Sequence, residues 1–360
     1  MKNLTHLIGS FLLLTLFESF ALAQNSRTFV SGHGVDTNPC SLTAPCRTFT
    51  QALSQTNAGG EVVVLDSAGY GPFAITKAVT IEAPSGVYAG ITVTAGDGID
   101  INAAAPNTTP GTVILRGLTI NNQGASGGGV VVISVGTLYV ENCVINGFSS
   151  ETGGPQGSGI GGLGFLCPGN LEVKDSVMRG NTNGILIEPS SGTALGVPPY
   201  QTAVVSLDHV RLEGNLNYGL EAESGSNVSA HNSIASGNFF FGFFANASTA
   251  PIAMDLVACV ASNNEDGGIE GAAFGPAAAV VNIEGCAVTG NNAFSGSMGI
   301  LAQTGADGPS TIRLSNSIVT DNTYGLKISG GGMILSRGNN TVAGNRTADI
   351  SGTIGSYSAQ

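Results

Sequence analysis

The sequence predicts an all-β protein that winds into a right-handed parallel β-helix of about ten or eleven coils, over residues 58–360. Three observations predict it. One pattern of apolar and polar residues recurs along most of the chain, and each copy holds short alternating segments separated by Gly, Asn, Asp or Ser. No sustained helical period runs through the copies. A short capping helix is expected before the coils, within residues 24–57.

The first residues read as an export signal. Lys2 precedes an apolar run over Leu7–Phe17, and the small-residue pattern at Ala21 and Ala23 follows it. We therefore expect residues 1–23 to be a signal peptide and the mature protein to be secreted or periplasmic. The apolar run is too short to span a bilayer, so no membrane span is expected.

Charge argues against some partners. The chain has 12 basic and 24 acidic residues, a net charge of −12, and no cluster of Lys or Arg. Such a field repels phosphate polymers, so nucleic acid is not an expected partner. The hydrophobic share of 42% is enough to build a core. We expect a monomer.

The repeat is clearest in the second half of the chain. Two copies read LEVKDSVMRGNTNGILIE (171–188) and VSLDHVRLEGNLNYGLEAE (205–223). Each copy contains an anchor asparagine, and the seven anchors are Asn181, Asn215, Asn238, Asn264, Asn291, Asn322 and Asn345. Their unequal spacing indicates insertions at loops between conserved strand positions. We interpret these asparagines as structural, bonding the backbone of neighbouring coils.

The N-terminal cap is predicted from two features. Residues 48–56 place Phe49, Ala52 and Leu53 on one helical face, just after Cys40 and Cys46. In an exported chain, a disulfide between these two cysteines is expected. The pairing of Cys143, Cys167, Cys259 and Cys286 stays open; Cys259 and Cys286 fall on adjacent coils, either bonded or reduced.

Residues 32–73 (GHGVDTNPCSLTAPCRTFTQALSQTNAGGEVVVLDSAGYGPF), followed by the asparagine-anchored coils, resemble the right-handed parallel β-helix repeat proteins of the pectin-lyase-like superfamily. The likeness covers nearly the whole mature chain. It implies the fold and leaves function open, since the superfamily includes polysaccharide lyases, hydrolases, esterases and epimerases as well as adhesins.

Aligning the coils on the anchor asparagines brings one set of catalytic candidates together. Lys174, Asp208, His209 and His231 fall on three successive coils, where an acid, a base and histidines converge. The alternative is a set of solvated side chains at a turn, forming weak ion pairs.

An aromatic cluster supplies binding candidates. Tyr218, Phe240, Phe241 and Phe244 lie on two adjacent coils, where rings can stack on sugar faces, while Phe243 should point into the core. A partly buried aromatic ladder explains the same residues.

Carboxylate pairs are the third kind of candidate. Glu221 and Glu270 flank Phe244 in the alignment, and Glu188 falls next to Glu223. Paired carboxylates can share a proton or hold Ca²⁺, although a solvated acidic face is the alternative. Looser Ca²⁺ candidates are Asp97 with Asp100 and Glu265 with Asp266. No cofactor is required.

Two functions follow. The favoured one is a secreted, non-catalytic protein that binds a glycan or another cell-surface partner along its side. The alternative is a polysaccharide lyase or glycoside hydrolase with a site near Asp208, His209 and His231.

Overall fold

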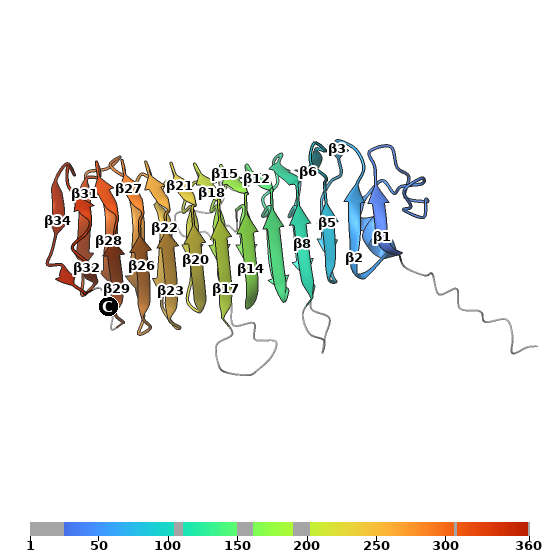
Figure 1. The fold of residues 1–360 in the computed structure, drawn as a ribbon. Coiled ribbons are helices and arrows are strands. Elements are labelled where there is room, and N and C mark those ends of the chain that lie inside the picture. Colours follow the sequence, from blue (N-terminus) through green and yellow to red (C-terminus); the bar gives the residue numbers. More distant parts are fainter. Residues whose placement is uncertain (1–24, 104–110, 150–160, 190–201, 306–307, 359–360) are drawn as a thin grey trace, which may run out of the picture.

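The computed structural model describes residues 25–103, 111–149, 161–189, 202–305 and 308–358. The predicted signal peptide, residues 1–23, lies outside them. Within the described residues the chain is an elongated stack of coils running from β1 to β34 and β35 (Figure 1). Each full coil contributes one strand to each of three parallel sheets, which confirms the right-handed parallel β-helix.

Sheet 1 has 13 strands in consecutive order along the stack. They are β1 (Asn25–Val30), β2 (Thr56–Val64), β5 (Val79–Glu82), β8 (Thr112–Arg116), β11 (Thr137–Glu141), β14 (Gly169–Lys174), β17 (Ala203–Asp208), β20 (Ser226–His231), β23 (Ile252–Val257), β26 (Ala279–Glu284), β29 (Ser310–Ser315), β32 (Met333–Ser336) and β35 (Gly355–Ser356).

Sheet 2 has 11 strands and follows sheet 1 within each coil. They are β3 (Ala68–Gly69), β6 (Ala89–Val93), β9 (Leu118–Asn122), β12 (Val144–Asn146), β15 (Val177–Arg179), β18 (Arg211–Glu213), β21 (Ile234–Ser236), β24 (Val260–Ser262), β27 (Ala287–Thr289), β30 (Ile318–Thr320) and β33 (Thr341–Val342).

Sheet 3 also has 11 strands and completes each coil. They are β4 (Phe73–Ile75), β7 (Ile99–Asn102), β10 (Val130–Ser134), β13 (Leu163–Phe165), β16 (Ile185–Ile187), β19 (Leu220–Ala222), β22 (Phe241–Ala247), β25 (Gly267–Ala273), β28 (Met298–Thr304), β31 (Tyr324–Ser329) and β34 (Ala348–Ser351). Three strands per coil give eleven coils, at the upper end of the predicted count.

The core is built from residues that alternate inward along each strand. In sheet 1 one inward row runs in register through eight strands, and all of its members are buried: Leu138, Leu171, Val205, Val228, Met254, Val281, Ile312 and Ile334. No single coil can bury this face alone, so the coils stabilise one another by stacking.

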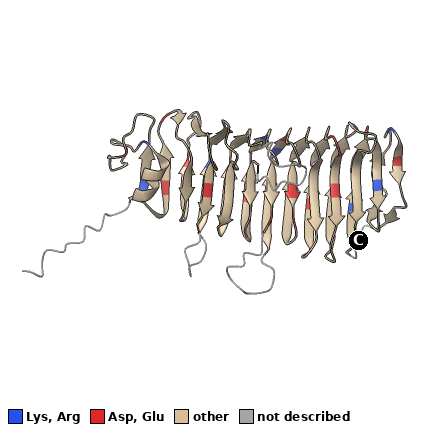
Figure 2. Cartoon of the chain, turned by 180° about the vertical axis from the view of Figure 1, so that it is seen from behind, with Lys and Arg blue, Asp and Glu red and all other residues tan. Residues whose placement is uncertain are grey.

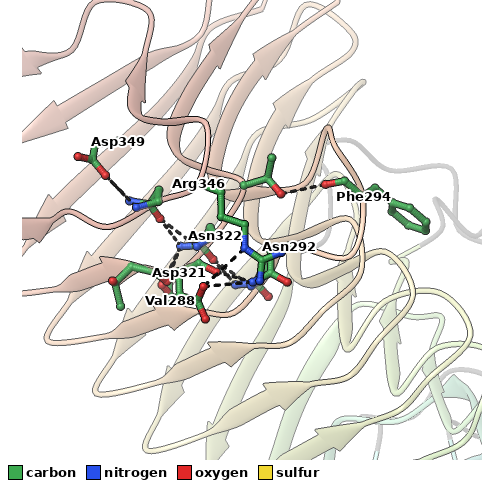
Figure 3. Close-up of polar contacts among 11 residues, drawn as sticks. Val288, Asn292, Phe294, Asp321, Asn322, Arg346 and Asp349 are labelled. Atoms are coloured by element: carbon green, nitrogen blue, oxygen red, sulfur yellow. Dashed lines mark hydrogen bonds and ion pairs between the residues drawn. The ribbon is translucent and has the colours of Figure 1, made fainter.

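The anchor asparagines form a hydrogen-bonded ladder between sheets 2 and 3, as predicted. The side-chain oxygen of Asn264 accepts from the backbone N–H and side-chain nitrogen of Asn238, at 3.1 and 2.8 Å, and the same pattern repeats at Asn291. Figure 3 shows the C-terminal end, where Asn322 bonds the Val288 carbonyl and Asp349 accepts the last bonds of the row, from Asn345.

The Gly that precedes five of the seven anchors has a conformational cause. The residue preceding each anchor has a positive φ throughout the ladder: Gly180, Gly214, Gly237, Asn263, Gly290, Asp321 and Gly344. Glycine takes this conformation without strain, and Asn and Asp tolerate it better than most residues. The Gly-Asn signature of the repeat is therefore a turn requirement.

The predicted helix is α2 (Phe49–Gln55), with Thr48 as its N-cap, and it buries Phe49, Ala52 and Leu53 against β1, β2 and β4. The outer edge of β1 is not left open, because Phe29 donates to the Cys40 carbonyl and Ser31 to that of Cys46. The predicted Cys40–Cys46 disulfide is formed, which holds this covering segment together.

Candidate functional site

The predicted catalytic residues lie on the outer face and rim of sheet 1. Lys174, Asp208 and His231 are in register on β14, β17 and β20, and His209 occupies the left-handed turn after β17. The Asp208 Oδ1 atom lies 2.8 Å from His209 Nδ1, and Oδ2 lies 3.8 Å from Lys174 Nζ. His231 hydrogen-bonds Ser229 through Nε2 at 3.0 Å.

This cluster is open to solvent. The side chains of Lys174 and His209 are each 58% exposed, and that of Asp208 is 36% exposed. A hydrogen bond from Asn232, together with the neighbouring His209 and Lys174, lowers the pKa of Asp208. The carboxylate is thus ionised at neutral pH, and its exposed pairs are worth under about 1 kcal/mol each.

A shallow hollow of about 350 Å³ lies beside this cluster on the same sheet. Of the predicted catalytic residues, only His231 lines it, and the remaining polar lining mixes acids, a base and amide or hydroxyl groups: Ser229, Asp255, Asn282, Glu284, Arg313 and Tyr357. Asp255 accepts from Asn282 at 2.7 Å, and Arg313 donates to Asn282 at 3.2 Å. Its charged groups are Asp255 on β23, Glu284 on β26 and Arg313 on β29. The hollow therefore has no single preferred ligand charge.

The predicted aromatic cluster lies where the chain enters sheet 3. The rings of Tyr218 and Phe244 stack with centroids 4.7 Å apart and planes 14° apart, and Tyr218 lies 5.3 Å from Phe240. Phe239 then contacts Phe240 at 5.1 Å and Phe294 at 6.2 Å. We call Tyr218, Phe239, Phe240, Phe244 and Phe294 the aromatic strip.

The strip differs from the predicted cluster in its exposure and membership. Tyr218 and Phe240 are half-buried and Phe239 and Phe294 are exposed, whereas Phe241 and Phe244 expose only 4% and 5%. The buried Phe244 ring therefore lies beneath the ring of Tyr218. Phe241 packs over Gly267, where the Cβ of any other residue would clash with the Phe241 ring. Sequence reasoning missed Phe294 because it lies in the longer insertion between two anchors.

Phe241 and Phe244 belong to a second apolar cluster, separate from the core inside the coils. Its buried members are Phe241, Phe244, Ala272, Met298 and Leu301, with Tyr218 and Tyr324 packed against it. This cluster lies on the outer face of sheet 3, because Phe244 and Leu301 occupy outward positions next to the inward Phe243 and Ile300. An apolar layer therefore covers a sheet face that would otherwise be solvated.

Two glutamates are set into this layer. Glu221 and Glu270 occupy one outward row of sheet 3, which reads Leu186, Glu221, Phe244, Glu270 and Leu301 on successive strands. Each carboxyl thus has an apolar neighbour on both sides. Burial raises the pKa of Glu270 to about 8, with repulsion from Asp266 adding to it. Burial, then the charges of Glu223 and Glu188, raises the pKa of Glu221 to about 8.

The two glutamates differ in their partners. Asn183 donates to Glu221 Oε2 at 2.9 Å, while the neighbouring Glu223 accepts from Asn246 at 3.0 and 3.1 Å. Glu270 is 6% exposed, and its side chain forms no hydrogen bond or ion pair with any described residue. Charged residues are otherwise sparse on the ribbon, as the rear view in Figure 2 shows.

The Ca²⁺ candidates form pairs only. Burial and the adjacent Asp97 raise the pKa of Asp100, and Asp97 itself accepts from the Gly128 N–H at 2.6 Å. Burial also raises the pKa of Asp266, which neighbours Glu265. Within the described ranges, no group of three or more His, Cys, Asp or Glu is placed to hold a metal ion. Ca²⁺ binding at either pair stays a prediction.

The four remaining cysteines are reduced and buried. Cys259 and Cys286 are adjacent, as the alignment predicted, but they are not bonded; the Cys259 N–H donates to Cys286 Sγ at 3.3 Å. Cys143 occupies the same row as Ser176, which accepts its N–H at 3.1 Å. These thiols serve as small inward residues.

No family model and no curated protein matches the sequence. Several solved structures resemble the fold. A GH136 lacto-N-biosidase from Eubacterium ramulus gives a TM-score of 0.55 at 10% identity, covering 92% of this chain and 68% of that chain. Pectate lyase Pel9A gives 0.54 at 15% identity, covering 92% and 80%. With the three long parallel sheets, these likenesses show the fold of the chain, a right-handed parallel β-helix.

Proposed function

We propose that the protein binds carbohydrate along the outer face of sheet 3. The observation that carries the proposal is the aromatic strip with Glu221 and Glu270 set beside it. Sugar rings present apolar C–H faces that pack on aromatic rings, and their hydroxyl groups need polar partners at the edges. The half-buried Tyr218 and Phe240 offer ring surface, and the glutamates offer the polar partners.

Burial makes these glutamates suitable for neutral hydroxyl groups. With pKa values near 8, both are protonated at neutral pH in the free protein. A carboxylic acid donates one hydrogen bond and still accepts others, so it matches the donor and acceptor character of a sugar hydroxyl. Ordered rings also bind without losing much conformational freedom.

The same two groups argue for binding over hydrolysis. A glycosidase that works through two carboxyls needs one protonated and one ionised. Here burial raises the pKa of both Glu221 and Glu270 to about 8, so neither group has the low pKa that an ionised partner needs. The pair is therefore not divided into an acid and a base.

Export supports the proposal. The predicted signal peptide and the Cys40–Cys46 disulfide fit a secreted or periplasmic protein, where glycans are accessible. Within the described residues no helix is long and apolar enough to cross a bilayer. The two similar solved structures carry the names of a glycosidase and a pectate lyase, so β-helices of this type act on glycans.

Cleavage of a polysaccharide at Lys174, Asp208, His209 and His231 is the second candidate. One observation favours it: the Asp208 carboxylate lies 2.8 Å from His209 Nδ1, an arrangement that orients a histidine for proton transfer. Its exposure weighs against it, because water competes for each charge.

A polysaccharide screen tests both candidates. Retention on neutral or uronic glycans should be lost when Tyr218→Ala and Phe240→Ala are combined, by roughly thirtyfold in Kd if each ring contributes about 1 kcal/mol. Phe274→Ala is the matched control, because Phe274 is 44% exposed and lies outside the strip. Binding that survives the double substitution would refute the proposal. Product formation that disappears in Asp208→Asn would favour the second candidate instead.

A further inference from the structure

Two of the four buried thiols lie next to each other inside the coils. Cys259 and Cys286 follow β23 and β26, and the strands before and after them pair in register, so the two side chains are stacked on adjacent coils. They are 2% and 3% exposed. Cys143 occupies the same row, but its neighbour on the next coil is a serine, Ser176. The row therefore holds one thiol pair and one thiol beside a hydroxyl.

The spacing of the pair suits a disulfide. Stacked residues of adjacent parallel strands lie about 4.8 Å apart, and the Cα atoms of the Cys40–Cys46 disulfide of this chain are 4.6 Å apart. Disulfides span Cα separations of about 4.4 to 6.8 Å and Cβ separations of about 3.5 to 4.5 Å. Because stacked Cβ atoms are also about 4.8 Å apart, the two turns need to approach each other by about 1 Å or less.

The sulfur of Cys286 leans on the coil before it. Its Sγ accepts the Cys259 N–H at 3.3 Å and lies 3.4 Å from the Leu256 carbonyl oxygen. The Cys259 Sγ lies 3.3 Å from the Ala230 carbonyl oxygen, one coil further back. The two sulfurs meet when the Cys259 thiol turns toward Cys286, which is a rotation about a single side-chain bond.

Packing alone does not require sulfur at these two positions. Serine occupies the same row on other coils, where Ser176, Ser233 and Ser317 each accept a backbone N–H of the preceding coil at 3.1 Å. Sulfur is the weaker acceptor, so cysteine fills this hydrogen-bonding role less well than serine does. What two consecutive cysteines add to the row is the chemistry of a thiol pair.

The pair also differs from the other thiols in acidity. Hydrogen bonding with the Cys286 side chain lowers the pKa of the Cys259 thiol, whereas burial raises the pKa of Cys143 and Cys167 to about 11. The thiolate is the form that attacks a disulfide. Of the four thiols, Cys259 is therefore the one best suited to begin an exchange reaction.

We propose that Cys259 and Cys286 form a second disulfide when the exported chain folds, and that this bond staples two adjacent coils. The oxidant is a disulfide, such as oxidised glutathione or a protein disulfide of the oxidising compartment. The Cys259 thiolate attacks it and releases one thiol; the Cys286 thiolate then attacks the mixed disulfide and releases the other. Two electrons pass to the oxidant, whose two thiols take up the two cysteine protons. Because the folded pair is buried, the exchange takes place while the coils close.

The staple lies beneath the hollow on sheet 1. The Sγ atoms of Cys259 and Cys286 lie 3.4 Å from the carbonyl oxygens of Val257 and Glu284, respectively, and both of these residues line the hollow. A bond between the sulfurs ties β23 to β26, the two strands that carry this part of its lining. The inference is independent of carbohydrate binding on sheet 3.

Mass spectrometry of the exported protein tests the proposal. Exchange is quenched with acid, free thiols are alkylated under denaturing conditions, and the chain is cut after Glu, which separates the two cysteines at Glu265, Glu270 and Glu284. The expected product is a pair of peptides linked through Cys259 and Cys286, with the other two thiols alkylated. Protein that is first reduced and denatured, and then refolded in a buffer of oxidised and reduced glutathione, should give the same pattern.

Variants locate the bond. Cys286→Ser introduces the residue that other coils carry in this row, so it should fold and leave Cys259 alkylated. Cys143→Ser is the matched control, a buried thiol of the same row, and should keep the linked peptides. Reduction with dithiothreitol should lower the urea midpoint of unfolding further in the wild type than in Cys286→Ser, which has only the Cys40–Cys46 bond to lose.

The Cys40–Cys46 bond is the internal control for oxidising conditions. Alkylated Cys259 and Cys286 in a sample that has formed this bond overturn the proposal. Peptides that link either residue to Cys143 or Cys167 in similar amounts also overturn it, because the pairing would then be random. Equal falls of the urea midpoint in the wild type and Cys286→Ser would overturn the role of the bond as a staple.

Discussion

Replacing Glu270 with Gln should change how the stability of the fold depends on pH. The carboxyl has an ordinary pKa of 4.5 and a folded pKa of about 8, caused chiefly by burial. When folding raises the pKa of an acid, its contribution to stability is fully present at pH values below the pKa in the unfolded chain. This contribution is lost as the pH rises through the pKa in the folded protein. Stability should therefore fall between about pH 4.5 and pH 8.

The size of the effect follows from the shift. At 1.36 kcal/mol for each pKa unit, holding the charged form at this buried position costs on the order of 5 kcal/mol. Gln has nearly the same shape and no charge, so Glu270→Gln should lose that part of the pH dependence. At pH 8 the variant should be more stable than the wild type by a few kcal/mol, about 5 to 10 °C in Tm.

The chain has no Trp, so unfolding is best followed by far-ultraviolet circular dichroism of the sheets in urea, at pH 5, 7 and 9. Infrared spectroscopy at neutral pH should also show a protonated carboxyl that disappears in the variant. Glu172→Gln is the control. A variant whose stability falls with pH as steeply as the wild type would mean that Glu270 is ionised in the folded protein, and the burial argument would be wrong.

Three further predictions concern the fold. Ile283→Asp puts a charge at an inward position that is 2% exposed and should prevent folding, whereas Val260→Asp at a half-exposed position should cost under about 1 kcal/mol of stability. The yield of soluble folded protein measures both variants. Equal losses would mean that the assigned strand register is wrong by one residue. Asn264→Ala leaves several buried polar groups without partners, so it should lower the free energy of unfolding in urea by about 3 kcal/mol or more. Asn227→Ala, at an exposed position, should leave it unchanged. Equal losses in the two variants would show that the ladder does not stabilise the fold. Mass spectrometry of the exported protein should show a chain that begins at Gln24 and carries the Cys40–Cys46 bond. Replacing both cysteines, Cys40→Ser with Cys46→Ser, should lower the free energy of unfolding by about 2 kcal/mol. Unchanged stability would mean that the disulfide does not stabilise the fold.

The sequence predicts this fold well because the fold is local and repetitive. The row Lys174, Asp208 and His231 could be aligned from anchor asparagines alone, and the strand register agrees with it. Each coil meets only its neighbours, so an alignment of copies is already a contact map. The same logic placed Cys259 beside Cys286, but it could not decide between a thiol pair and a disulfide, which depends on the side-chain geometry.

The candidate site was harder to predict because burial on the outer face is not visible in one coil. Glu172 and Glu270 occupy comparable outward strand positions, yet Glu172 is exposed and Glu270 is buried. The difference comes from neighbours in register, Phe244 and Leu301, which belong to other coils. A charged residue in a strand therefore cannot be classified as solvated from its own segment.

A usable sequence signal was nevertheless present. In a solenoid with one hydrophobic interior, outward positions are expected to be polar, so a large apolar residue there requires a second buried layer. Phe244 and Leu301 are such residues, and they alternate with Glu221 and Glu270 in a single row of sheet 3. Acids placed inside an outward apolar row should have raised pKa values because each loses water on both sides. Comparing the outward residues at one strand position in successive coils, and looking for large apolar residues there, would have ranked Glu221 and Glu270 ahead of the exposed Asp208 and His209 as the site to test.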